Sequence, residues 1–163
     1  MITLTQINEM DLQEFVSCFG DIAEHSPWVA EAAKRHFSTR DDMIQAFGET
    51  VFAAAEHQQL SLLRFHPDLA TKAKLTAEST HEQKGAGLDS LNPQEFAEFN
   101  SLNERYKTQN GFPFIYAVKG ATKHQILDSF QQRIHHERAE EFKVALQQVC
   151  KIIGLRLSDR VAE

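Results

Sequence analysis

Apolar residues recur three and four positions apart along most of this chain, and glycine or proline falls between the periodic stretches. This period is typical of amphipathic helices, which bury one face and expose the other. We therefore predict an all-α fold with about eight or nine helices, arranged as one compact domain over residues 1–163. The expected helices run from Asp11 to Gly20, over 29–36, from a Thr39 cap through Ala54, over 58–65, over 77–86, from Asn92-Pro93 to Asn110-Gly111, from a Thr122 cap to Ile134, and over 139–157.

Local signals set several of these ends. Asp11 and Glu14 have the spacing of a capping box, and Gly20 is a typical stop. Ser26 followed by Pro27 predicts an N-cap and a proline at the first helical position. The dipeptide Asn110-Gly111 suits positive φ and predicts a helix end.

Residues 112–118 do not follow the helical pattern. They are apolar without a 3.6-residue period and contain a proline, which predicts an extended, buried segment. One extended segment in a helical protein has no sheet partner for its backbone N–H and C=O groups. Helix ends, side chains, water or a ligand must satisfy them. The alternative to a ligand-contacting role is that this segment is a loop that only packs in the core.

A candidate site lies around His66. A residue before a proline is pushed out of the α region, so a helix ending near Phe65 leaves His66 at its C-terminal lip, where the helix dipole favours imidazolium. Further on, Ser79, Glu82 and Gln83 stand at i, i+3 and i+4, on one helical face. Imidazole, carboxylate, hydroxyl and amide groups together suit acid–base work on a small polar molecule.

Both signals have structural alternatives. A histidine beside a proline is often a solvated or satisfied loop residue. Ser79 and Glu82 also have the spacing of a capping box, in which both side chains would bond only their own backbone.

Arg156 continues an otherwise apolar stripe in the last expected helix. Burying a guanidinium without a partner is costly. The side chain therefore either snorkels at the helix end or faces an anionic partner, bidentately if that partner is a carboxylate. The apolar members of the stripe are Phe142, Leu146, Val149 and Ile153.

Composition narrows the functional classes. Net charge is −6 with a pI near 5.7, which argues against nucleic acid or an anionic membrane as a partner. The apolar runs are too short to span a bilayer, and the N-terminus lacks the features of a signal peptide. Cys18 and Cys150 each lie in an apolar helical pattern, which predicts buried free thiols in a reducing cytoplasm.

No signature of a metal or cofactor site is present. The sequence has no HExxH, CxxC, Walker or GxGxxG motif. His135, His136 and Glu137 are consecutive, so on a helix they point in different directions. We expect neither a metal nor an organic cofactor.

Several stretches, spread in order over nearly the whole chain, match one family pattern. They are His25-Ser26-Pro27-Trp28, residues 62–70, residues 75–83, Ala86-Gly87-Leu88, residues 102–106, residues 111–115 and residues 151–157. Each stretch alone is a weak signal, but together they are specific. They resemble the family of 2-oxo-4-hydroxy-4-carboxy-5-ureidoimidazoline (OHCU) decarboxylases of purine catabolism. One departure is Asn110, where the resemblance leads us to expect phenylalanine.

The resemblance implies an all-helical homodimer that forms (S)-allantoin from OHCU without a cofactor. It implies that His66 is the catalytic histidine. It also implies backbone contacts from one stretch to the ureido and ring amides of the substrate. The implied substrate-contacting positions are Pro67, Ser79, Glu82, Gln83 and Arg156, and the backbone stretch is Phe114, Ile115, Tyr116, Ala117 and Val118.

The implied chemistry suits these residue types. The OHCU carboxylate is attached beside a C=N bond, so the substrate can take up its own electron pair when CO₂ leaves. We expect His66 to act on the 4-hydroxyl or carboxylate side and Glu82 to orient it or share the proton transfer, although these two roles are exchangeable. Ser79 and Gln83 would hold ring and ureido groups, and Arg156 would hold an anionic or carbonyl oxygen.

Two other functions are alternatives to OHCU decarboxylation. One is a lyase or hydrolase acting on another ureide or hydantoin, and the other is a non-catalytic helical interaction module.

Overall fold

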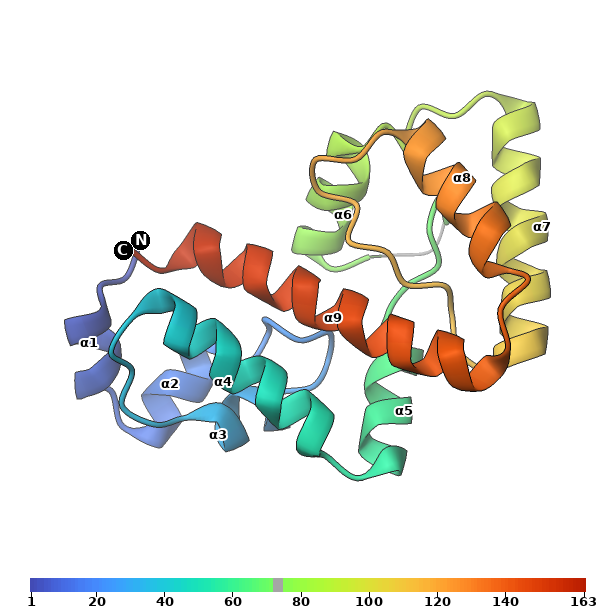
Figure 1. Cartoon of the computed structure of the whole chain (residues 1–163). Helices are drawn as coiled ribbons and strands as arrows, with labels where there is room; N and C mark the ends of the chain where they lie inside the picture. Colours follow the sequence, from blue (N-terminus) through green and yellow to red (C-terminus); the bar gives the residue numbers. More distant parts are fainter. Residues whose placement is uncertain (72–74) are drawn as a thin grey trace. The chain divides into compact units, whose positions relative to one another are not determined.

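The computed structural model of the chain describes residues 1–71 and 75–163, and within these ranges it contains nine helices (Figure 1). The only other regular pairing in the described ranges is an isolated bridge between Ile2 and Val161. The predicted all-α class and helix number are therefore confirmed. The helices are α1 (Leu4–Glu9), α2 (Leu12–Phe19), α3 (Trp28–Ala33), α4 (Arg40–Ala53), α5 (Glu56–Phe65), α6 (Ala77–Gly85), α7 (Pro93–Asn110), α8 (Lys123–Arg133) and α9 (Arg138–Arg160).

The chain divides into two compact units. The first contains residues 1–65 and 149–163, and the second contains residues 66–148. Helix α9 contributes its first part to the second unit and its last part to the first. The expectation of a single domain over residues 1–163 stays a prediction. Among the described residues, no helix is long and apolar enough to cross a membrane.

The core of the first unit is built on aromatic rings from α2 and its neighbours. Phe15 lies at the centre, with ring centroids 5.0 Å from Phe19, 6.0 Å from Phe37 and 6.2 Å from Phe47. All four side chains are buried. The two chain ends meet in the same unit, where the amide of Ile2 donates to the carbonyl of Arg160 at 2.8 Å.

Most predicted helix starts are confirmed by their caps. Asp11 and Glu14 form the expected capping box, and Thr39 accepts from the amide of Asp42. Thr122 caps α8, and Gly111, with φ 78°, ends α7 in the left-handed conformation. A capping box of Thr3 and Gln6 opens α1, a helix that the hydrophobic pattern did not predict because only six residues are involved.

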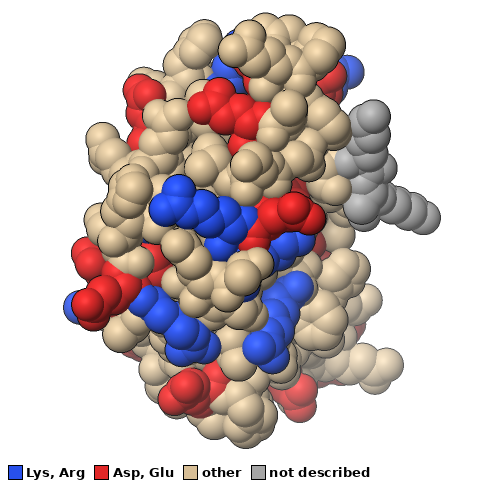
Figure 2. All heavy atoms as spheres, turned by 90° about the vertical axis from the view of Figure 1, so that its right-hand side faces the viewer, with Lys and Arg blue, Asp and Glu red and all other residues tan. Residues whose placement is uncertain are grey.

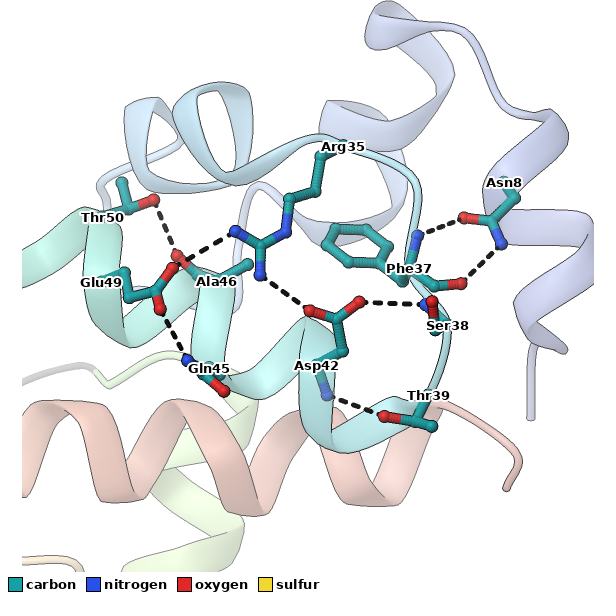
Figure 3. A network of polar contacts seen from close by, with 10 residues as sticks. All are labelled: Asn8, Arg35, Phe37, Ser38, Thr39, Asp42, Gln45, Ala46, Glu49 and Thr50. Atoms are coloured by element: carbon teal, nitrogen blue, oxygen red, sulfur yellow. Dashed lines mark hydrogen bonds and ion pairs between the residues drawn. The ribbon is translucent and has the colours of Figure 1, made fainter.

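Helix α3 differs from the prediction in both its N-cap and its last residue. Pro27 occupies the N-cap position and no side chain caps the helix, because the Ser26 hydroxyl donates to the carbonyl of Glu24 at 2.8 Å. The helix stops at Ala33 and not at residue 36. Figure 3 shows why: polar contacts hold residues 35–38 in a loop.

Two side chains from flanking helices hold that loop. Asn8 of α1 bonds both the N–H and the C=O of Phe37 at 2.9 Å. Asp42 of α4 accepts from the amide of Ser38 and from Arg35, and these bonds hold the pKa of Asp42 below its ordinary value. The backbone groups of the loop are therefore satisfied without continuing the helix.

The second unit is organised around one buried carboxylate. Glu141 of α9 is fully buried and accepts from the Tyr106 hydroxyl at 2.6 Å and from Arg133 Nε at 2.9 Å. His136 Nδ1 lies 3.0 Å from its other oxygen. Burial and the bond to Glu141 raise the pKa of Tyr106 far above its ordinary value. This network joins α7, α8 and α9, and Figure 1 shows α7 and α8 side by side.

Tyr106→Phe tests the contribution of the network to stability. The change removes a hydrogen bond to a charged acceptor, so we expect the free energy of unfolding in urea to fall by about 1.5–3 kcal/mol. The matched control is Tyr116→Phe, at a half-buried position, with an expected loss below about 0.5 kcal/mol. Equal losses in the two variants would contradict the role given to Glu141.

Candidate active site

His66 lies where the sequence predicted, directly after Phe65, the last residue of α5. Its side chain is buried, with a relative exposure of 8%, whereas Phe65 is 51% exposed. His66 is therefore not solvated, and its role in a site, as opposed to that of a satisfied loop residue, stays a prediction. Pro67 and Asp68 follow and are half-buried.

Ser79, Glu82 and Gln83 all lie within α6, so their spacing places them on one face of that helix. Ser79 and Gln83 are buried, and Glu82 is half-buried. The N-cap of α6 is Thr76, whose hydroxyl oxygen accepts from the amide of Ser79 at 3.2 Å. The alternative in which Ser79 and Glu82 form a capping box is therefore wrong, because Ser79 is already inside the helix.

Gln83 joins α6 to the segment that follows His66. Its Oε1 accepts from the amide of Ala70 at 3.0 Å, and its Nε2 donates to the carbonyl of Asp68 at 3.3 Å. The sequence predicted a substrate contact for Gln83 and did not predict this second role. Gln83 Nε2 carries two hydrogens, so donating one of them to Asp68 does not preclude a contact of the other with substrate.

Residues 112–118 form the predicted extended, buried segment between α7 and α8. Side chains satisfy two of its backbone groups: Arg133 Nη1 donates to the carbonyl of Ile115 at 2.7 Å, and the amide of Ala117 donates to Gln148 Oε1 at 2.9 Å. The Phe114 ring lies between the Phe130 ring, 3.8 Å away, and the Arg133 guanidinium, 4.2 Å away. The segment is thus held by α8 and α9.

A third backbone group of the segment is bonded as well. The carbonyl of Val118 accepts from the amide of Ala121 at 3.0 Å. The carbonyls of Ile115 and Val118 and the amide of Ala117 therefore already have partners within the chain.

Arg156 is buried, with 5% of its side chain exposed, so the snorkelling alternative is wrong. Its Nη2 lies 2.9 Å from Glu24 Oε1, and its Nη1 donates to the carbonyl of Ile22 at 3.1 Å. Glu24, which is 1% exposed, is therefore an anionic partner of Arg156 within the chain. Sequence reasoning missed Glu24, although it directly precedes the His25-Ser26-Pro27-Trp28 stretch.

The two units divide the predicted site residues. Arg156 and Glu24 belong to the first unit. His66, Pro67, the three α6 residues and the segment 114–118 belong to the second. Their convergence on one substrate stays a prediction.

The two cysteines are free thiols, and the described histidines do not form a metal site. Cys18 and Cys150 are free, as predicted, but half-buried, and burial raises the pKa of the Cys150 thiol to about 11. That thiol is therefore protonated at neutral pH and a weak nucleophile. Among residues 1–71 and 75–163, no three His, Cys, Asp or Glu side chains are grouped as metal ligands would be.

Asn110, where the resemblance led us to expect phenylalanine, is accommodated in the fold. It is the last residue of α7 and is buried, and its Nδ2 donates to the carbonyl of Tyr106 at 3.1 Å. Its own carbonyl accepts from Arg138 Nε at 2.9 Å. The polar side chain is thus accommodated by the last turn of its own helix.

Comparison with known proteins places this arrangement in a family. The family model described as OHCU decarboxylase matches residues 8–158. The chain belongs to the OHCU decarboxylase family. A decarboxylase of Haloferax volcanii, named for the same substrate, is 43% identical over 98% of this chain and 96% of its own length.

Two further relatives are longer than this chain. The uric acid degradation bifunctional protein PucL of Bacillus subtilis is 42% identical across the chain, which covers 33% of that protein. A crystal structure of (S)-allantoin synthase superposes with a TM-score of 0.81 at 36% identity. The match covers 98% of this chain and 54% of the solved one, so the chain spans about half the length of that protein.

Glu24→Gln tests the buried ion pair. Removing one charge of a buried pair leaves the other uncompensated, so we expect the free energy of unfolding to fall by about 3–5 kcal/mol. The matched control is Asp21→Asn, three residues earlier in the chain. Asp21 pairs with Arg160 but is 61% exposed, so its loss should cost less than about 1 kcal/mol.

Urea unfolding of the two variants measures both values. Adding Arg156→Met to Glu24→Gln should recover part of the loss, because the unpaired charge is then gone. Equal losses for Glu24→Gln and Asp21→Asn would contradict the assignment.

Proposed function

We propose that this protein catalyses the decarboxylation of OHCU to (S)-allantoin in the degradation of urate, without a cofactor. Family membership along almost the whole chain supports the reaction class. The observation that carries the assignment is the buried His66, in a segment that Gln83 fastens to the helix with Ser79 and Glu82.

The reaction needs little beyond positioning and proton transfer. Cleavage of the bond between C4 and the carboxylate leaves an electron pair, and the neighbouring C=N bond of the substrate accepts it. The nitrogen of that C=N bond takes up one proton, the 4-hydroxyl releases its proton and becomes a carbonyl, and C5 gains a proton, so the net uptake is the one proton that replaces CO₂. The protein must therefore orient the ring, accept the hydroxyl proton, allow the ring nitrogen to be protonated and deliver a proton to one face of C5.

The roles of the residues follow from their chemistry. His66 acts as acid or base at the 4-hydroxyl or carboxylate side, and Glu82 orients it or shares the transfer. Ser79 and the remaining amide hydrogen of Gln83 bind ring and ureido groups, with Pro67 lining the site beside His66. Arg156 binds an anionic or carbonyl oxygen. Its guanidinium has five N–H donors, and the bonds to Glu24 and Ile22 hold its plane in one orientation.

The extended segment supplies the backbone contacts. Of the residues Phe114 to Val118, we assign the contacts to the polar groups of Phe114 and Tyr116 and to the amide of Val118. The carbonyls of Ile115 and Val118 and the amide of Ala117 already have hydrogen-bond partners within the chain, which supports this assignment.

We further propose that the protein works as a homodimer in the cytoplasm, as its family resemblance implies. Two free cysteines fit a reducing compartment. Nucleic acid is a poor fit as a partner. The net charge is −6, and on the face shown in Figure 2 basic and acidic side chains are interspersed.

The test of the proposed reaction is the stereochemistry of the product. OHCU generated in situ should disappear faster with the protein, and circular dichroism should show allantoin of one hand, because a fixed ring exposes one face of C5. The spectrum must be read before allantoin racemises. Racemic product formed at high protein concentration would overturn the assignment, however fast OHCU disappears.

His66→Asn should lower kcat by about 10²–10⁴-fold, the usual contribution of a positioned acid or base. The melting temperature should change little. The matched control is His57→Asn, on the exposed surface of α5, which should retain full activity. Full activity in His66→Asn would remove His66 from the chemistry.

A further inference from the structure

Asn103 of α7 is a buried polar residue that the proposed chemistry does not use. It lies in the stretch Leu102-Asn103-Glu104-Arg105-Tyr106, which carries part of the family resemblance. Its side chain is 3% exposed, and its Nδ2 donates to the carbonyl of Leu69 at 2.9 Å. Its Oδ1 has no hydrogen-bond partner among the described residues. Burying a carbonyl oxygen without a hydrogen bond lowers the free energy of unfolding, so packing alone does not explain an asparagine at position 103.

The contact to Leu69 belongs to a larger clamp on residues 68–70. Gln83 of α6 holds the residues on either side, through the carbonyl of Asp68 and the amide of Ala70. Lys107, one turn after Asn103 on α7, lies 2.7 Å from the Asp68 carboxylate. Side chains of α6 and α7, two helices of the same unit, therefore bond all three of the consecutive residues 68–70.

The clamped backbone is strained. Ala70 has φ 55°, in the left-handed region that alanine rarely adopts. Such a conformation persists only where the surroundings determine it, and strain of this kind gathers at functional sites. The hydrogen bonds of Asn103 to Leu69 and of Gln83 to Ala70 hold this conformation in place.

We propose that Asn103 is a positioning residue that fixes His66 through the clamped segment, an inference that rests on the proposed function. Only Pro67 and Asp68 separate the imidazole residue from the anchored Leu69. Proline holds its own φ near one value, so little freedom remains between the anchor and the histidine. Release of Leu69 would let the segment relax toward ordinary backbone angles and move the imidazole away from its reactive orientation.

Asn103→Leu is the discriminating variant. It removes the Nδ2 donor, which leaves the Leu69 carbonyl unpaired, but it also removes the unpaired Oδ1. The two effects on stability oppose each other, so the melting temperature should change little. We expect kcat to fall by about ten- to a hundredfold with KM within about twofold, because a misplaced catalytic group lowers the rate more than substrate binding.

The matched control is Asn100→Leu, one turn earlier on the same helix. Asn100 is half-buried, and its Nδ2 donates at 2.9 Å to the carbonyl of Phe96 in its own helix. It has the same chemistry but holds no segment near His66. Its kinetic constants should equal those of the unaltered protein.

A second readout does not depend on activity. With isotope-labelled histidine, the His66 imidazole signal is identified among the eight histidines by its loss in His66→Asn. In Asn103→Leu this signal should shift or broaden, while the others stay in place; in Asn100→Leu none should move. If Asn103→Leu fails to fold, Asn103→Ser, whose hydroxyl is too short to reach the Leu69 carbonyl, replaces it.

Either of two results would overturn the proposal: an unshifted His66 signal in a folded Asn103 variant, or an unchanged kcat despite a shifted signal. If the unaltered protein does not act on OHCU, the proposed function fails. The imidazole signal still reports whether Asn103 fixes His66.

Discussion

The structure depends on the pairing of charges that cannot reach water. Each compact unit contains one buried guanidinium and one buried carboxylate: Arg156 with Glu24 in the first, and Arg133 with Glu141 in the second. Burying either charge without its partner would greatly lower the free energy of unfolding. Each pair therefore fixes where its neighbouring backbone lies, because the same guanidinium also bonds a carbonyl, of Ile22 or of Ile115.

The same principle governs the segments without secondary structure. Residues 112–118 and 68–70 have no ladder or helix to satisfy their backbone, so side chains from neighbouring helices do so. Arg133 and Gln148 bond the first segment, and Gln83 and Asn103 bond the second. Amide and guanidinium groups are well suited to this task because they present donors in fixed directions. Part of the proposed site therefore takes its geometry from side chains whose hydrogen bonds hold neighbouring backbone.

Helix caps and breakers made most of the fold predictable from the sequence. Asp11, Thr39, Asn92 and Thr122 act on backbone groups within three residues, so their effect does not depend on the rest of the molecule. Prediction was wrong where a longer-range contact competed. Ser26 bonds a preceding carbonyl and does not cap α3, and Asn8 holds the loop into which that helix would have continued.

The sequence by itself determined the helical class, the extended segment, the position of His66 after α5 and the shared face of the α6 residues. All of these depend on local spacing and on the restricted backbone of proline and glycine. The partner of Arg156, the fastening of residues 68–70 by Gln83 and Asn103, and the support of Ile115 by Arg133 were decided by the tertiary structure. These contacts join residues from 13 to 132 positions apart, and a hydrogen bond between such residues exists only once the chain has folded.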